Sequence, residues 1–371
     1  MAQMSVVPFV PSDFSWRMYV DLNHDLSAVH DDAAARTHWL EHGFGQRRLY
    51  ALHQLYVEDE FGNEVVLYIP YYCYLRDAGL LFGHRIHTYR GMRDIYIAAG
   101  FSPDQIVERH ARRHWAPPAR RPFVPPQSEH ARRFDPEFRR PPPLRAAFAD
   151  DAEAWTALRA AAGDDGRPLA IVHNKVNIEW GALRAVNAMP TDAVLSAVAQ
   201  LLTEGFRVLY IRPRAAAAGP VGSIATARGF SEDAGELIEC DDFAKLEAAY
   251  GVGEVLSMEA LLTNLPSDWS YNRVKGVMYA HCSHFVHCQG GASYFAAYFG
   301  GHQIVYHIRG DELVAGAYPD WFQTLYPGGM ASLVVVQSPA ALDAALRGEA
   351  WRHAKEAPSA DANAFSAITS A

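Results

Sequence analysis

The chain lacks the features that mark several large protein classes. Its 371 residues include only four cysteines, Cys73, Cys240, Cys282 and Cys288, and this number is too small for a disulfide framework in a chain of such length. No apolar run reaches the roughly 18 to 20 residues that a membrane-spanning helix needs, and residues 1–11 lack the basic start and apolar stretch of a signal peptide. These absences predict a cytoplasmic protein without a transmembrane segment.

Signatures of metal and nucleophile chemistry are also missing. No Asp-x-Asp pair occurs in the chain, so no acidic pair is evident that would hold a divalent ion against a sugar diphosphate. The Gly-x-Ser-x-Gly elbow, the Walker loop and the three-glycine dinucleotide fingerprint are absent as well. Residues 281–288 are rich in His and Cys, but alternate side chains of a strand face opposite ways, so neighbouring His and Cys residues there cannot easily bind one ion. We therefore expect no metal, and we also expect no cofactor.

The overall composition is that of a globular protein, with half of the residues hydrophobic and a fifth charged. The net charge of -9 argues against nucleic acid as a partner. Eighteen Tyr, eighteen Phe and eight Trp supply flat rings that suit sugar contacts and protein cores equally.

Residues 165–350 alternate between buried strands and amphipathic helices, which predicts a parallel sheet covered on both faces. We predict strands at 169–172, 207–211, 236–238, 254–256, 285–288, 303–307 and 333–336, and helices that include one capped by Thr191 or Asp192, one at 272–281 and one starting at 338–339. In such sheets, ligands bind beyond the carboxyl ends of the strands. This region is therefore expected to be a Rossmann-like domain that carries the site.

The remainder of the chain divides into three further parts. Residues 12–52 predict a small helical module, and residues 356–371 a flexible tail. Residues 55–150 predict an α/β domain, with strands at 64–70 and 85–88, and helices at 71–80, 92–99 and 103–114. This domain ends in a segment, 116–145, that has nine prolines and three Arg pairs; it is either a wrapping linker or a basic strap near a phosphate.

A glycine turn follows the strand predicted at 285–288. Gln289, Gly290 and Gly291 lead directly into a helical stretch that stops at Gly300 and Gly301. Glycine lacks a Cβ, so a ligand can approach the backbone closely, and the N-terminus of a helix favours phosphate. Ser293 adds a hydroxyl. The alternative is a tight connection from strand to helix that holds no ligand.

Polar residues follow other predicted strands in the same way. Residues 173–181 come directly after the strand at 169–172, and Arg212 and Arg309 follow the strands at 207–211 and 303–307. Lysine and arginine pair with phosphate, and Glu179 can act as a base or bind sugar hydroxyls. The alternatives are a capped loop with a buried His and Trp, and arginines that are merely solvated.

Several motifs occur together over roughly residues 60–340: His-Asn-Lys-x-Asn-x-Glu-Trp-Gly at 173–181, Tyr210-Ile-Arg-Pro213, Tyr271-Asn272, the segment 289–301, and Tyr306-His-x-Arg-Gly310. This combination resembles a poorly characterised family of glycosyltransferase-like proteins with a GT-B type of fold, found near polysaccharide and glycan assembly functions. The motif Tyr19-Val-x-Leu-Asn23 with His38-Trp-Leu-x-His-Gly43 looks like a small helical module found beside other glycosyltransferases.

The resemblance implies two Rossmann-like domains that face each other across a cleft, with the nucleotide-sugar donor in the C-terminal domain and the glycan acceptor against residues 55–150. It also implies transfer of a sugar to a glycan hydroxyl without a metal. We take Glu179, His173 and His87 as candidate catalytic residues. Candidate donor- or phosphate-binding residues are Gln289, Gly290, Gly291, Ser293, Asn174, Lys175, Arg212 and Arg309.

In this hypothesis, amides and cations stabilise the departing diphosphate, and a carboxylate or histidine takes the acceptor proton. Two alternatives stay open: a non-catalytic glycan- or nucleotide-binding module on a similar fold, and a transferase of another group such as pyruvyl or sulfate. Oligomeric state, donor sugar and anomeric outcome do not follow from the residues.

Overall fold

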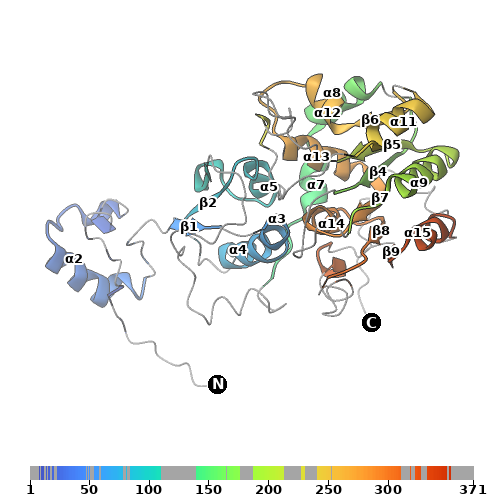
Figure 1. Ribbon diagram of the computed structural model, residues 1–371. Coiled ribbons are helices and arrows are strands. Elements are labelled where there is room, and N and C mark those ends of the chain that lie inside the picture. Colours follow the sequence, from blue (N-terminus) through green and yellow to red (C-terminus); the bar gives the residue numbers. More distant parts are fainter. Residues whose placement is uncertain are drawn as a thin grey trace, which may run out of the picture.

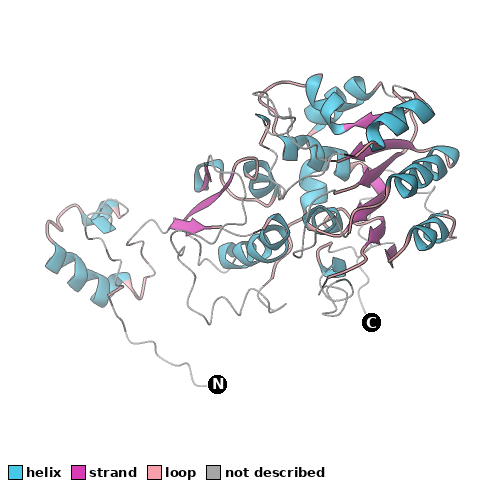
Figure 2. Cartoon of the chain, viewed as in Figure 1, coloured by secondary structure: helices cyan, strands magenta, loops and turns pink. Residues whose placement is uncertain are grey.

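Two parallel sheets with helices packed against them organise the protein, which confirms the predicted mixed α/β class (Figure 1 and Figure 2). The computed structural model describes residues 23–46, 54–57, 60–77, 84–109, 139–163, 165–175, 187–212, 227–229, 240–251, 253–310, 322–326 and 332–348, and the single positions 8, 10, 11, 14, 16, 19, 20, 48, 50, 81, 318 and 351. The predicted strand 236–238, most of the Pro-rich segment, Glu179 and the tail lie outside the described residues.

The larger sheet has six strands in the order β6-β5-β4-β7-β8-β9, all parallel. The strands are β4 (Leu169–His173), β5 (Arg207–Ile211), β6 (Val255–Ser257), β7 (Cys282–Cys288), β8 (His302–Tyr306) and β9 (Ser332–Val336). The chain runs outward from β4 to β6, then returns to the other side of β4 and runs outward again from β7 to β9. The strand order therefore reverses between β4 and β7, where open α/β sheets bind their ligands.

Helices cover both faces of this sheet. The helices α9 (Thr191–Thr203), α11 (Asp242–Tyr250) and α15 (Pro339–Leu346) pack on the face that contains Ala170 and Val172. The other face, which contains Ile171, is covered by α7 (Leu144–Ala149), α8 (Ala152–Ala162), α12 (Met258–Thr263), α13 (Tyr271–Ala280) and α14 (Gly291–Ala297). Alternate residues of each strand face opposite sides. Because helices cover both sides, all five residues of β4 are buried.

The smaller sheet consists of the parallel strands β1 (Gln54–Tyr56), β2 (Arg85–Tyr89) and β3 (Ile106–Arg109). The consecutive helical segments α3 (Phe61–Asn63), η3 (Glu64–Tyr68) and α4 (Ile69–Asp77) follow β1, and α5 (Arg93–Ala98) and η4 (Pro103–Gln105) separate β2 from β3.

Two predictions for this region are wrong. Residues 64–70 form helix instead of strand, because a short apolar run that is buried on all sides has no periodicity to distinguish the two. The helix predicted at 103–114 ends after one turn at Gln105, and β3 follows. Ser102 and Gln105 do form a capping box there, but Ile106 and Val107 are β-branched and pair with β2.

The two sheets share one hydrophobic cluster. It contains Leu55, Ile86 and Ile106 from the smaller sheet together with Ile171 and Phe285 from the larger one. Helix α3 packs on α14, α7 packs on α13, and the Tyr298 hydroxyl donates to the carbonyl oxygen of Val65 at 2.7 Å. The two α/β units are thus joined by continuous packing.

The N-terminal region has a separate core. The segments η1 (His24–Leu26), α2 (Asp32–His38) and η2 (Trp39–Gly43) surround a cluster formed by Phe14, Tyr19, Leu26, Ala35 and Trp39. The hydroxyl of Tyr19 lies 2.7 Å from Nδ1 of His38 and so close to Gly43 that a Cβ there would clash with it. Three residues of the N-terminal motif are therefore explained by packing.

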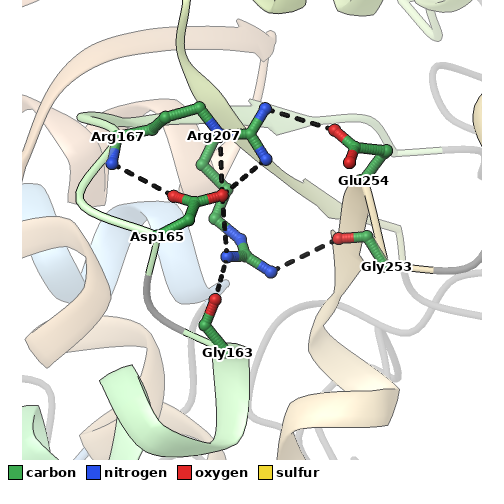
Figure 3. Close-up of polar contacts among 6 residues, drawn as sticks. All are labelled: Gly163, Asp165, Arg167, Arg207, Gly253 and Glu254. Carbon is green, nitrogen blue, oxygen red and sulfur yellow. Dashed lines mark hydrogen bonds and ion pairs between the residues drawn. The ribbon is translucent and has the colours of Figure 1, made fainter.

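The amino-terminal edge of the larger sheet carries a network of ion pairs (Figure 3). Arg167 lies 2.6 Å from Asp165 and 3.2 Å from Glu254. Arg207 pairs with the same Asp165 at 3.2 Å and donates to the carbonyl oxygens of Gly163 and Gly253. The network joins the residues that lead into β4, β5 and β6. No helix in the described parts of the chain has the length and apolar character of a transmembrane span.

Candidate functional site

The candidate site lies beyond the carboxyl ends of β4 and β7, where the strand order reverses. The chain leaves β4 through Asn174 and Lys175 and leaves β7 through Gln289 and Gly290. The backbone N–H of Gln289 donates to Tyr306 on β8 at 2.9 Å, so the sheet pairing continues up to the glycine turn. Loops that are far apart in the sequence therefore meet at one edge.

The Lys175 side chain lies beside Gly290, as expected for residues that follow neighbouring strands. A Cβ built on Gly290 would lie 3.4 Å from Nζ of Lys175. The φ angle of Gly290 is 130°, a value that disfavours every residue with a Cβ. Lys175 is only 8% exposed, so its charge is held beside the turn. In the first turn of α14, the N–H groups of Ser293 and Tyr294 donate to the carbonyl oxygen of Gly290 at 3.0 and 3.4 Å.

Gly291 and Ser293 differ from the expectation. A Cβ on Gly291 would lie 2.6 Å from Phe61 Cδ1 and 2.8 Å from the backbone nitrogen of Gly62. The close approach at Gly291 is thus made by α3 of the protein itself. The Ser293 hydroxyl is buried and donates to the carbonyl oxygen of Gly290 at 2.8 Å. Both residues therefore shape the turn, and at Gly290 the nearest side chain to a Cβ would be that of Lys175.

Two buried asparagines hold the loop that connects β4 to α9. The Asn174 side chain accepts from the N–H groups of Lys175 and Met189 at 3.0 and 2.9 Å and donates to the carbonyl of Met189 at 3.0 Å. This closes the base of the loop and orders Lys175. Asn187 extends to the loops after β7 and β8, where it bonds to Gln289 and to residues 308 and 309.

The two candidate arginines have different environments. Arg212 forms a 2.6 Å ion pair with Asp242, and both side chains are 1% exposed. Its guanidinium also lies over the Phe243 ring. Arg212 is therefore bound internally, which removes it from the set of phosphate ligands. Arg309 is exposed and makes no ion pair with any described residue, so its charge is available at the edge.

His173 is a poor candidate for the base. It is fully buried, with Nδ1 2.9 Å from the Tyr279 hydroxyl and its ring 5.6 Å from that of His287. Burial holds the pKa of His173 well below its usual value, and the charges of Lys275 and Lys175 lower it further. The residue is thus neutral and enclosed in the protein, which disfavours His173 as the base that takes a proton from an acceptor.

Lys275 is a residue that sequence reasoning missed. Its ammonium is fully buried and lies 5.0, 4.7 and 5.5 Å from the ring centroids of Phe61, Phe295 and Tyr279. These rings come from α3, α14 and α13, and Phe61 is the side chain that contacts Gly291. One sequence signal could have identified it: Lys275 is the charged residue within the otherwise apolar stretch 274–280, and lysine is rarely buried.

His87 lies in the smaller sheet, on the strand face opposite to Ile86 and Thr88, both of which are buried. The side chain is half-buried, and burial together with Arg109 and Arg85 lowers its pKa. It is therefore neutral near pH 7 and able to accept a proton. The third candidate, Glu179, lies outside the described residues.

The His- and Cys-rich strand β7 carries no metal-site geometry. Cys282, His284, His287 and Cys288 are all buried. Within the parts of the chain that the structure describes, no group of three or more His, Cys, Asp or Glu residues is placed to hold a metal ion.

Comparison of the chain with family models, with curated proteins and with solved structures finds no match. The geometry at the carboxyl edge of the larger sheet is therefore the basis for a functional proposal.

Proposed function

We propose that the protein is a glycosyltransferase that transfers a sugar from a nucleotide-sugar donor to a glycan hydroxyl without a metal ion. The observation that carries this proposal is the position of the Lys175 ammonium beside Gly290, at the point where the strand order reverses. Cationic side chains and main-chain amides at such a position suit phosphate. The two parallel sheets agree with a GT-B-like arrangement, in which residues 55–150 would face the acceptor.

The proposed roles follow from what each side chain can reach. Lys175, the amides of the turn at Gly290, and Arg309 bind the diphosphate of the donor and stabilise the charge that develops on it as the glycosidic bond breaks. Asn174 holds Lys175 in place, and Gln289 links the turn to Asn187. The fixed ammonium of Lys175 beside the leaving diphosphate supplies the positive charge that a divalent ion supplies in metal-dependent enzymes.

The acceptor hydroxyl needs a base to receive its proton. Since His173 is enclosed, this role falls to His87 or Glu179. His87 fits chemically because its lowered pKa keeps the imidazole neutral at pH 7. If His87 is the base, activity falls as the pH drops below its pKa, since the protonated ring accepts no proton.

One observation favours a second candidate, a nucleotide- or glycan-binding module without turnover. The titratable histidine that ends β4 at the site is buried and bonded to Tyr279. A binding module keeps Lys175 and the glycine turn but has no use for a base. The two candidates differ in one measurable respect, since only the enzyme releases free nucleotide from a sugar nucleotide.

The test is a panel of sugar nucleotides with uridine, guanosine, cytidine, adenosine and thymidine bases, measured by thermal shift and by nucleotide release. We expect at least one to raise the melting temperature, and Lys175→Met to lower its affinity on the order of tenfold or more, because a charge-assisted contact is lost. Lys245→Met is the matched control, because Lys245 on α11 is exposed and pairs with Asp241, the residue before that helix.

The outcomes separate the candidates. Binding with nucleotide release supports the enzyme, and binding without release for any acceptor supports the binding module. If no sugar nucleotide changes the melting temperature or is hydrolysed, the donor site does not exist. Equal effects of the two lysine substitutions would likewise remove Lys175 from the site.

A further inference from the structure

Asn187 lies where three loops of the carboxyl edge meet. It stands just before α9, at the end of the loop that leaves β4. Its Nδ2 donates to Oε1 of Gln289 at 3.1 Å and to the carbonyl oxygen of Arg309 at 2.8 Å. Its Oδ1 accepts from the N–H groups of Ile308 and Arg309, both at 2.9 Å. One side chain thus joins the loop after β4 to those after β7 and β8.

The hydrogen-bonding capacity of this amide is fully used. An asparagine side chain offers two donors and two acceptor sites, and all four are engaged. Asn187 is 5% exposed, so water does not readily replace a lost partner. Three of the four bonds go to the main chain at 308 and 309. The position of Arg309 relative to Gln289 is therefore set by Asn187.

This arrangement ties the residues that carry two cations, Lys175 and Arg309, to one dipeptide, Gln289–Gly290. Gln289 is tied through Asn187 to the main chain of Arg309, and the next residue, Gly290, is contacted by Lys175. The Arg309 guanidinium is exposed and has no ion pair among the described residues. A monophosphate can engage one of the two cations, whereas a diphosphate carries charged oxygens on two phosphorus atoms and can engage both.

We propose that Asn187 is a positioning residue that holds Arg309 where it contacts the second phosphate of a nucleoside diphosphate, while Lys175 contacts the first. The proposal rests on the proposed function, because it assumes that nucleotide phosphates occupy this edge. It adds a residue that acts on the ligand only through Arg309, and it predicts a specific loss when that link is cut.

The test compares affinities for matched pairs of ligands by isothermal titration calorimetry: UMP and UDP, GMP and GDP, CMP and CDP, AMP and ADP, TMP and TDP. The unaltered protein prefers the diphosphate of its own base on the order of tenfold, the value of one added charge-assisted contact. Asn187→Ala and Arg309→Ala each abolish this preference and leave the monophosphate affinity unchanged. The double variant shows no further loss, since both changes remove the same contact.

Asn174→Ala is the matched control. Asn174 is also a buried, hydrogen-bonded asparagine of the same loop, but it orders Lys175 and Met189. Its replacement weakens monophosphate and diphosphate binding alike and leaves their ratio intact. A purely structural role of Asn187 would give this same pattern, which is why the ratio is the decisive quantity.

Two results overturn the inference while leaving the proposed function in place. One is an unchanged preference for diphosphate in Arg309→Ala, a substitution of an exposed side chain that can be measured even if Asn187→Ala does not fold. The other is an equal loss of both affinities in Asn187→Ala. If none of the ten nucleotides binds the unaltered protein, the inference and the proposed function fail together.

Discussion

At the amino-terminal edge of the six-stranded sheet, Arg167 and Arg207 are bound to carboxylates and carbonyl oxygens, whereas at the carboxyl-terminal edge Arg309 is exposed and has no ion pair among the described residues. The first arrangement is complete within the chain and links three strands. The second leaves positive charge that a bound anion would neutralise. The difference separates charge used for structure from charge available for binding.

Arg212 refines this comparison, because it stands at the carboxyl edge and yet behaves like the arginines of the opposite edge. Its partner Asp242 lies at the start of α11 and is as deeply buried as the arginine itself. The carboxylate of Asp242 therefore makes Arg212 a structural cation. Lys175 and Arg309 follow β4 and β8, on the two sides of the glycine turn, whereas Arg212 follows β5.

The largest expected effect concerns this internal pair. Asp242→Ala leaves the Arg212 guanidinium buried without its carboxylate, which we expect to cost about 3 to 5 kcal/mol of unfolding free energy in urea denaturation. The neighbouring Asp241→Ala is the control, because Asp241 is exposed and pairs only at the surface, and it should leave stability unchanged. Equal stability of the two variants would show that the pair is not structural.

The second prediction tests whether the space beside Gly291 is filled by the protein itself. Gly291→Ala forces a methyl group against Phe61 and the backbone of Gly62, which should cost about 1 to 3 kcal/mol through overpacking. Gly62→Ala is the matched variant, since its Cβ would lie 3.3 Å from Gly291 Cα and needs a smaller shift. A neutral Gly291→Ala would mean that the space there is open, and the glycine would again be a candidate for ligand contact.

We expect the stability of the protein to depend on pH through His284, which lies near the amino-terminal end of β7. Burial, with a contribution from His302, lowers the pKa of His284 to about 4, below its value near 6.5 in the unfolded chain. Between these values only the unfolded chain takes up the proton, so stability falls as the pH drops from 7 toward 4. We expect a loss of about 1 to 2 kcal/mol between pH 7 and pH 5 from this residue.

Denaturation of His284→Phe at the two pH values measures that contribution. The ring retains packing near Phe206 and Trp351 but cannot titrate, so the variant should lose less stability on acidification. An identical pH dependence in both proteins would place the acid sensitivity elsewhere.

The smallest effect is expected at the amino edge. Arg167→Ala removes one member of the network in Figure 3, whose side chains are partly exposed. Surface pairs of this kind contribute less than about 1 kcal/mol and are screened by salt. The difference from the unaltered protein should therefore shrink when denaturation is repeated in high salt. A loss as large as that of Asp242→Ala would contradict the distinction between exposed and buried pairs.

Much of the larger sheet was predictable, because its strands are short buried runs with a clear local signal. The strand at 207–211 matches β5 in full, and those at 303–307 and 254–256 differ from β8 and β6 by one residue at each end. The contact between Lys175 and Gly290 followed from the rule that polar residues after parallel strands meet at one edge.

The parts that could not be predicted depend on contacts distant in the sequence. Nothing near Arg212 reveals that Asp242 takes its charge, and nothing near Gly291 reveals that Phe61 occupies the space beside it. Asn187 was missed because its three partner residues, Gln289, Ile308 and Arg309, are brought to it by the strand order of the sheet, which local sequence patterns do not reveal. The helix at 64–70 was missed because burial on every side hides the period of the element.

The cluster of apolar side chains shared by both sheets limits how this chain can evolve by recombination. Exchange of either half for a homologous one would expose apolar surface unless the partner half changed with it, since Phe61 and Phe295 pack together across the junction. Recombination between relatives is thereby disfavoured at this boundary. Point changes at an exposed loop position such as Arg309 meet no such obstacle, and new ligand preferences would arise there first.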